Sequence, residues 1–210
     1  MAILIVGLVA ALSLLILPRF IGTKLDKTLV QYGILEKRFG LSQKVTRSVW
    51  GKGIGERHTL AGHYRGYDVS LYHHFHGKGK RRQEWTSLVF ETLFAGGFEL
   101  RIGFKDTSPQ ARFASLENGA SRELPAGVSL ACNDDAFLEA LARETVADRL
   151  ASLSSAGIPG AILLSKGFLE YREAGQMVDE AMRLRFQQAF LVLAELADAL
   201  SVHLAKRQKG

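Results

Sequence analysis

The feature that most constrains this chain is an uninterrupted apolar run over residues 2–17, which carries no charge and a single hydroxyl, that of Ser13. A run of this kind is typical of a membrane-spanning helix, although at 1.5 Å per residue it reaches only about 25 Å, the short end of the range. A buried helix of a globular domain rarely lacks a polar side. A secretory signal peptide has basic residues before the run and small residues after it, whereas here Pro18 and Arg19 follow. We therefore predict a transmembrane anchor over residues 1–22.

The charges around this run predict its orientation. Basic residues follow it closely and none precedes it in the sequence; they are Arg19, Lys24, Lys27, Lys37 and Arg38. Lysine and arginine are retained on the cytoplasmic side of membrane proteins. We expect a single-pass protein of the cell membrane with its amino terminus outside and its domain in the cytoplasm.

The remaining charge is unevenly spread along the chain. Residues 19–105 hold 16 Lys/Arg against 7 Asp/Glu, whereas residues 106–210 hold 11 against 14. A basic half next to an anchor indicates attraction to anionic lipid, and a nucleic-acid footprint is the other common cause. The one cysteine, Cys132, lies in an apolar run, which favours a buried thiol and is compatible with a reducing compartment.

Two hydrophobic periods divide the rest of the chain. Residues 23–44 carry apolar residues near a period of 3.6 and predict a juxtamembrane helix or, equally, a solvated linker. Residues 45–210 then form one domain. A period of two predicts strands, the first group of which makes an antiparallel meander of about four strands; the predicted strands are 45–50, 56–64, 67–74, 83–94, 98–105, 128–132, 161–165 and 168–172.

Two longer segments in this domain predict helices. An apolar stripe runs from about Asp134 to Ser154, and a second helix is expected from Gln176 to about Arg207. Residues 106–127 lack a clean period and predict either a functional loop or an unrecognised element. The predicted fold is therefore α+β: an antiparallel β-meander sheet with two helices packed on one face, preceded by an N-terminal transmembrane helix.

The second helix contains an unusually apolar stretch, Ala189–Leu200, in which Glu195 and Asp198 are the only charges. A helix that is apolar on most sides must be covered on most sides. The stretch therefore either lies across a sheet beneath other elements or offers a face to a second copy of the chain, as a homodimer.

The order of these elements, together with G-H-Y-R-G-Y-D-V over Gly62–Val69 and N-D-D-A-F over Asn133–Phe137, resembles bacterial single-pass membrane-anchored proteins of unknown function. The resemblance covers most of residues 40–205. It implies a short anchor followed by a meander, a helix, a hairpin and a long C-terminal helix, and it implies no catalytic residue.

A strongly basic hairpin tip is the clearest candidate binding site. The tip begins at Gly77 and includes Gly79. It carries Lys78, Lys80, Arg81 and Arg82, which supply donors for phosphate oxygens. The spacing is not that of a phosphate-binding P-loop. The simplest interpretation is a charged tip that only keeps the hairpin soluble. If the tip binds a ligand, anionic lipid headgroups are expected where it faces the membrane, and nucleic acid is the alternative.

Histidines cluster in the same region. His74 and His76 share a strand face, and His63 lies on the paired arm, so these three are the candidates for a metal site, with Asp68 or Glu84 completing it. The neighbouring run of four cations opposes a further cation, and we expect no cofactor.

The sequence shows no nucleophile elbow and no recognised catalytic pairing. We therefore predict a membrane-anchored cytoplasmic interaction or scaffold domain that is not an enzyme. The alternatives are a phosphate-recognising module acting through the basic tip and a metal-dependent enzyme using the histidines. Nucleic acid is a less favoured partner than the membrane.

Overall fold

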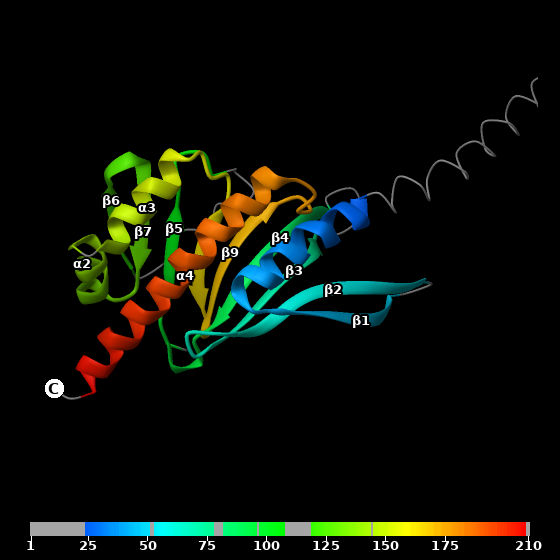
Figure 1. Cartoon of the computed structure of the whole chain (residues 1–210). Helices are drawn as coiled ribbons and strands as arrows, with labels where there is room; N and C mark the ends of the chain where they lie inside the picture. The colour runs from blue at the N-terminus through cyan, green and yellow to red at the C-terminus, as the bar shows by residue number, and fades with distance from the viewer. Residues whose placement is uncertain are drawn as a thin grey trace, which may run out of the picture.

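The computed structural model describes residues 24–50, 53–77, 82–95, 97–107, 119–143 and 145–208. In these residues nine strands form one antiparallel sheet in the order β1-β2-β3-β4-β9-β8-β5-β7-β6 (Figure 1). The strands are β1 (Ser42–Trp50), β2 (Gly53–Tyr64), β3 (Tyr67–His76), β4 (Gln83–Glu91), β5 (Leu100–Gly103), β6 (Ala120–Leu124), β7 (Val128–Cys132), β8 (Ala161–Ser165) and β9 (Phe168–Ala174). The helical elements are residues 24–39, α2 (Asp135–Arg143), α3 (Thr145–Ser155), α4 (Glu180–Arg207), and the short turns η2 (Leu93–Ala95) and η3 (Pro125–Gly127). The predicted α+β class is confirmed.

Alternation of apolar and polar residues gives the sheet one apolar face. A row of directly opposite residues on this face crosses seven strands, and each is at most 2% exposed: Leu60, Leu71, Leu88, Tyr171, Ile162, Ile102 and Leu130. The helices α2, α3 and α4 lie on one side of the sheet in Figure 1, and their packing buries this row. The expected arrangement of helices on one face is therefore present, with more helices than predicted.

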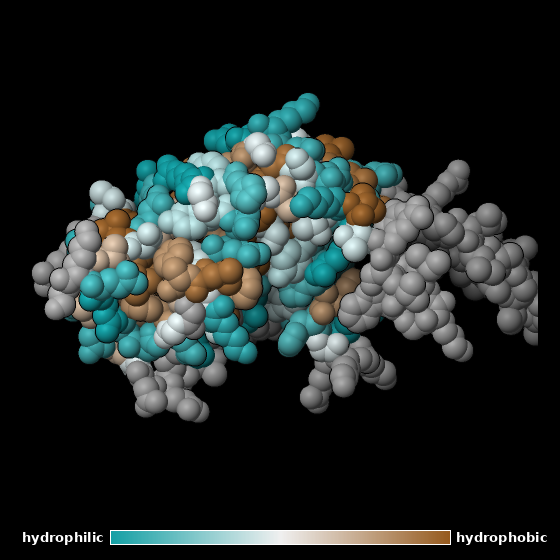
Figure 2. Space-filling model, turned by 90° about the horizontal axis from the view of Figure 1, so that it is seen from below, coloured by the Kyte–Doolittle hydropathy of each residue, from teal (hydrophilic) through white to brown (hydrophobic). Residues whose placement is uncertain are grey.

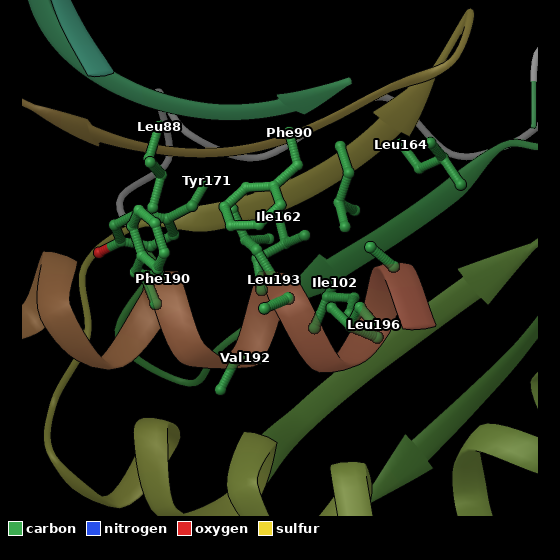
Figure 3. Packing of buried hydrophobic residues seen from close by; sticks show 14 of the residues in the cluster. Leu88, Phe90, Ile102, Ile162, Leu164, Tyr171, Phe190, Val192, Leu193 and Leu196 are labelled. Atoms are coloured by element: carbon green, nitrogen blue, oxygen red, sulfur yellow. The ribbon is translucent and has the colours of Figure 1, made fainter. Parts of the chain in front are cut away.

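The long helix α4 lies directly on the apolar face. It begins at an N-cap, Asp179, whose carboxylate accepts a hydrogen bond from the backbone N–H of Met182. Figure 3 shows Phe190, Leu193 and Leu196 of α4 pointing toward the side chains of the sheet. The helix is thus the centre of the hydrophobic core.

The apolar stretch Ala189–Leu200 of α4 is covered within the chain. Val192, which points away from the sheet in Figure 3, is 3% exposed, and α3 packs along α4. Of the two explanations for this stretch, coverage by the sheet and neighbouring elements accounts for its composition. A homodimer through the stretch stays a prediction that the composition no longer requires.

Residues 24–39 form a helix that belongs to the same core. Tyr32, Leu35 and Phe39 are buried, and the ring of Phe39 stacks on that of Phe190 with centroids 3.8 Å apart. Near the start of α4, the guanidinium of Arg183 donates to the side-chain carbonyl of Gln31 over 3.0 Å. The segment that the sequence left open as helix or linker is therefore a helix docked alongside α4.

Two parts of the topology differ from the sequence-based expectation. β5 does not continue the meander but lies between β8 and β7, so that the hairpin β8–β9 separates it from β4. Within residues 106–127, the part after residue 119 forms β6 and η3, which makes it an unrecognised element. β6 escaped detection because Ser121, Arg122 and Glu123 on this edge strand are all exposed and carry no apolar alternation.

The predicted anchor over residues 1–22 lies outside the described residues. Among those residues one helix, α4, is long and apolar enough to cross a membrane by length and composition. Its burial between the sheet, α3 and the 24–39 helix identifies it as a core helix of the folded domain.

Candidate interaction surfaces

The second face of the sheet is polar, and no described helix covers it. A row of opposite residues crosses all nine described strands on this face: Ser42, Ala61, Ser70, Val89, Glu170, Leu163, Arg101, Ala131 and Ser121. Small and polar residues dominate the row. The domain is therefore two-layered, with one helical side and one open side.

The centre of the open face holds a hydrogen-bonded group of three side chains. The hydroxyl of Ser87 donates to Glu170 Oε1 over 2.6 Å and lies 2.9 Å from His74 Nε2. Because the serine proton is directed at the carboxylate, the imidazole donates to the serine oxygen and does not accept its proton. A nucleophilic serine needs the opposite arrangement. This group fastens β3, β4 and β9 together and does not form a catalytic triad.

Two arginine side chains on the open face lie over aromatic rings. The guanidinium of Arg57 lies 4.7 Å from the ring centre of Tyr72, and that of Arg172 lies 5.3 Å from that of Trp85. Burial is the main cause that lowers the pKa of His74, and these arginines lower it further. Trp85 is 4% exposed, so its ring is unavailable for stacking on a nucleobase.

A second group of side chains lies where β3 ends and β4 begins, at the hairpin tip. There Arg82 lies over the ring of Phe75, its guanidinium carbon 3.9 Å from the ring centre. His73 pairs with Glu84, with 2.9 Å between Nε2 and Oε1. Burial lowers the pKa of His73, and the nearby charge of Lys24 lowers it further. We call this region the anchor-side end, because the charge of Lys24, the first described residue after the predicted anchor, acts on His73 there.

Of the four cations predicted at the hairpin tip, Arg82 is described and exposed, and Lys78, Lys80 and Arg81 lie outside the described residues. Arg82 immediately precedes β4 and lies two residues before Glu84, which is directly opposite Phe75. Its contact with Phe75 was not expected from sequence, because it depends on the register of β3 against β4.

The three candidate metal-binding histidines are not brought together. His63 pairs with Asp68 at one end of the β2–β3 hairpin, and His74 lies six residues further along β3, roughly 20 Å away at the rise of a strand. His74 Nε2 is hydrogen-bonded to the hydroxyl of Ser87, and His76 is exposed at the end of β3. Among the described residues no group of three or more His, Cys, Asp or Glu side chains is placed to hold a metal ion.

The opposite end of the domain carries an apolar patch that the sequence analysis missed. Three large side chains are exposed there: Leu93 (65%), Phe94 (51%) and Phe168 (43%). They come from η2 and from the start of β9, which the hydrogen bond from Thr92 N–H to the carbonyl of Gly167 holds together over 2.7 Å. Seen from the lower side of Figure 1, the surface shows apolar residues gathered among polar ones (Figure 2). We call Leu93, Phe94 and Phe168 the distal patch.

The two turns that carry the patch are packed closely against each other. Gly167 has φ +80°, and a Cβ there would lie 2.9 Å from the Cα of Leu93. Glycine is therefore required both for the backbone angle and for the approach. Single exposed apolar residues are common on protein surfaces, and the signal that marks this site is their convergence from two turns.

Comparisons with known proteins give a structural similarity but no match in sequence. No family model matches it, and no curated protein matches it in sequence. Among solved structures, the crystal structure of the mycobacterial trehalose monomycolate transport factor A, TtfA, is similar with a TM-score of 0.51 and 11% sequence identity. The similarity covers 85% of this chain and 94% of that chain. At this identity it shows a shared fold.

Proposed function

We propose that this chain is a membrane-anchored interaction domain on the cytoplasmic side, without catalytic activity of its own. The observation that carries the proposal is the distal patch, an apolar surface that follows the end of β4 opposite to Arg82. A contiguous apolar patch of a few hundred Å² on a monomer is often a binding site for a partner. The domain then links a membrane, on one side, with a protein, on the other.

The size of the patch favours a partner of limited contact area. A large apolar side chain offers roughly 200 Å² when fully open, so three that are about half exposed present roughly 300 Å². A stable dimer interface buries about 800 Å² on each partner. A short segment of another protein fits the patch better than a second copy of this chain. Because TtfA is named as a transport factor, membrane transport proteins are the first class of partner to test.

Docking of the 24–39 helix supports the membrane part of the proposal. The helix is packed on α4 through Phe39 and Phe190, so the described chain is already part of the folded domain in this first helix. The apolar segment 2–17 precedes the helix in the sequence. An anchor in this position would hold the domain at a short distance from the bilayer.

The test uses the full-length chain in cells, with a photo-crosslinking amino acid at position 94 and, as the control, at position 202. Val202 is 54% exposed on α4 and lies outside the distal patch. We expect a discrete crosslinked species from position 94, weakened by Leu93→Ser, and none from position 202. Equal crosslinking from both positions, or a product insensitive to Leu93→Ser, would contradict the proposal.

Membrane attachment and side are tested on the same chain. We expect the protein to stay in the membrane fraction after alkaline carbonate extraction. A cysteine engineered at the exposed position 202 should react with a membrane-impermeant thiol reagent only after the cells are opened. Cys132 is buried and does not interfere. Extraction into the soluble fraction, or labelling in intact cells, would refute the anchor or its orientation, respectively.

Phosphate recognition at the anchor-side end is the second candidate function. It is favoured by the cation of Arg82 and by Lys24, which lies close enough to His73 to lower the pKa of this residue. Binding to anionic vesicles should weaken as salt is raised and should weaken further in Arg82→Ser. Salt-independent binding would rule it out. Binding of a single-stranded oligonucleotide in preference to vesicles would instead support nucleic acid.

A further inference from the structure

One half of the open face is basic. The row of opposite residues that follows the row given above crosses all nine strands: Lys44, Thr59, Tyr72, Ser87, Arg172, Ala161, Gly103, Ser129 and Glu123. On strands β1–β4 and β9 this row carries two cations and no acidic residue. The next row adds Arg57 on β2, His74 on β3 and Trp85 on β4. Among the described residues it also lacks an acidic side chain on these strands.

His74 lies next to two aromatic rings, each of which carries an arginine. Trp85 is directly opposite His74, and the guanidinium carbon of Arg172 lies 5.3 Å from the centre of its ring. Along β3, the ring of Tyr72 lies 5.5 Å from that of His74 and carries the guanidinium of Arg57 at 4.7 Å. The strand register and the two rings therefore bring both arginines to the neighbourhood of one imidazole.

One carboxylate, that of Glu170, borders this group. It lies two residues before Arg172 on β9, and its Oε1 accepts the hydroxyl proton of Ser87. Two guanidiniums and a protonated His74 would hold three positive charges against this one negative charge. The difference of about two charges matches a phosphate monoester, whose charge near neutral pH is about −1.5 to −2.

The protonation of His74 is linked to such a ligand. Burial is the main cause that lowers the pKa of His74, the carboxylate of Glu170 opposes this, and the charges of Arg57, His73 and Arg172 lower the pKa further. A bound anion acts in the direction of Glu170 and raises the pKa. Because Nε2 donates to Ser87, the added proton lies on Nδ1, which becomes a second donor.

The surroundings of this group suit a soluble ligand better than a bilayer. Trp85 is 4% exposed, and none of the large apolar side chains that are exposed among the described residues belongs to these two rows. A contact with lipid uses aromatic or aliphatic side chains that extend beside the cations. Recognition of a phosphate group in water requires only donors and positive charge.

We propose that Arg57, Arg172 and His74 bind the phosphate group of a small soluble phosphate monoester on the open face of the sheet. The guanidiniums donate charge-assisted hydrogen bonds to the phosphate oxygens. This site is separate from the distal patch and from the hairpin tip with Arg82. It goes beyond the interaction function proposed above and does not depend on membrane attachment.

The test follows the imidazole signal of His74 by nuclear magnetic resonance. The full-length chain is labelled with carbon-13 at histidine and kept in an uncharged detergent, and His74→Asn assigns the signal by its loss. Inorganic phosphate is titrated slightly above neutral pH, with potassium chloride at the same ionic strength as the reference. We expect a saturable shift of the His74 signal with phosphate and none with chloride. A pH titration in saturating phosphate should give a higher pKa for His74 than one in chloride.

Arg57→Gln should raise the Kd for phosphate about tenfold or more, because a charge-assisted donor is lost. Arg82→Gln is the matched control and should leave the Kd unchanged. It also removes an exposed arginine that lies over an aromatic ring, that of Phe75. Since Arg57 and Arg82 are both exposed, both variants should unfold within about 4 °C of the wild-type temperature.

Four results would overturn the proposal. The first is the absence of a saturable shift, or an equal shift with chloride. The second is equal weakening by Arg57→Gln and Arg82→Gln, which a general loss of positive charge explains. The third is phosphate binding that leaves the pKa of His74 unchanged, which removes the imidazole from the site. The fourth is a shift in nanodiscs that contain phosphatidic acid but none with glycerol phosphate, which assigns the site to a lipid headgroup. None of these results affects crosslinking from position 94, so the proposed interaction function stands or fails separately.

Discussion

The substitution Phe39→Ala tests whether the 24–39 helix is part of the folded domain. Phe39 is 7% exposed, its ring stacks on Phe190, and Tyr64 meets it edge-on with centroids 5.9 Å apart. Removal of a buried phenylalanine side chain lowers the free energy of unfolding by about 3–5 kcal/mol, through lost transfer free energy and the cavity left behind. The sheet and α4 surround the site on several sides, which leaves little room for collapse and places the value within this range.

The predicted change is large enough to measure as a melting temperature. For a domain of this size each 1 kcal/mol shifts Tm by about 2–4 °C, so we expect a decrease of roughly 6–20 °C. The assay is thermal unfolding of the full-length chain in detergent, followed by near-ultraviolet circular dichroism. Ile34→Ala on the same helix is the control. Ile34 is 42% exposed, and its truncation should change stability by about 0.5 kcal/mol.

Two results would refute this reasoning. A decrease in Tm for Phe39→Ala that equals that of Ile34→Ala would show that the helix contributes nothing to the core. Loss of amide-exchange protection confined to residues 24–39, with Tm unchanged, would show that the helix detaches from a domain that is stable without it. In either case the 24–39 helix would not be part of the cooperative fold that the contact between Phe39 and Phe190 indicates.

Three further predictions concern the core and its ionisable groups. Glu173 is 3% exposed and paired with Arg185, so Glu173→Ala should lower the free energy of unfolding by about 3 kcal/mol or more in chemical denaturation; a loss below about 1 kcal/mol would contradict a buried ion pair. The pKa of His74 is lowered in the fold, so the unfolded chain binds the proton more tightly and stability should fall as pH decreases below about 6.5; His74→Asn should flatten this decrease, and an identical pH profile would disprove the assignment. Burial raises the pKa of Cys132 to about 11, so thiol reagents at neutral pH should modify it only at the rate of unfolding; rapid labelling of the native protein would refute its burial.

The sequence-based prediction was correct where neighbouring residues alone define an element. The strands β7 and β8 have the predicted bounds, Val128–Cys132 and Ala161–Ser165, because short apolar runs between turn residues identify them. β6 was missed, since an exposed edge strand needs no apolar alternation. The predicted helix from Asp134 to Ser154 is instead described as α2 and α3, because one continuous stripe does not distinguish one helix from two that pack against the same surface.

The candidate sites likewise divide into features that the local sequence shows and contacts that depend on the fold. The basic tip was recognised from composition, but the Phe75–Arg82 contact depends on strand register, and the distal patch depends on two turns that are about 75 residues apart in sequence and joined by a hydrogen bond. The histidines illustrate the reverse error. Nearness in sequence suggested a common site, whereas the hairpin places His63 and His74 far apart along its length.

The sequence by itself determined the α+β class, the apolar and polar faces of most strands, the long core helix and the basic character of residues 19–105. These features depend on residues within a few positions of one another, because hydrophobic period, caps and turns act locally. Only the tertiary structure decided that β5 joins β8 and β7, that the 24–39 helix docks on α4, and that Leu93, Phe94 and Phe168 meet at one end. Such contacts arise because distant segments compete to cover the same apolar surface, and that competition is resolved when the whole sheet is assembled.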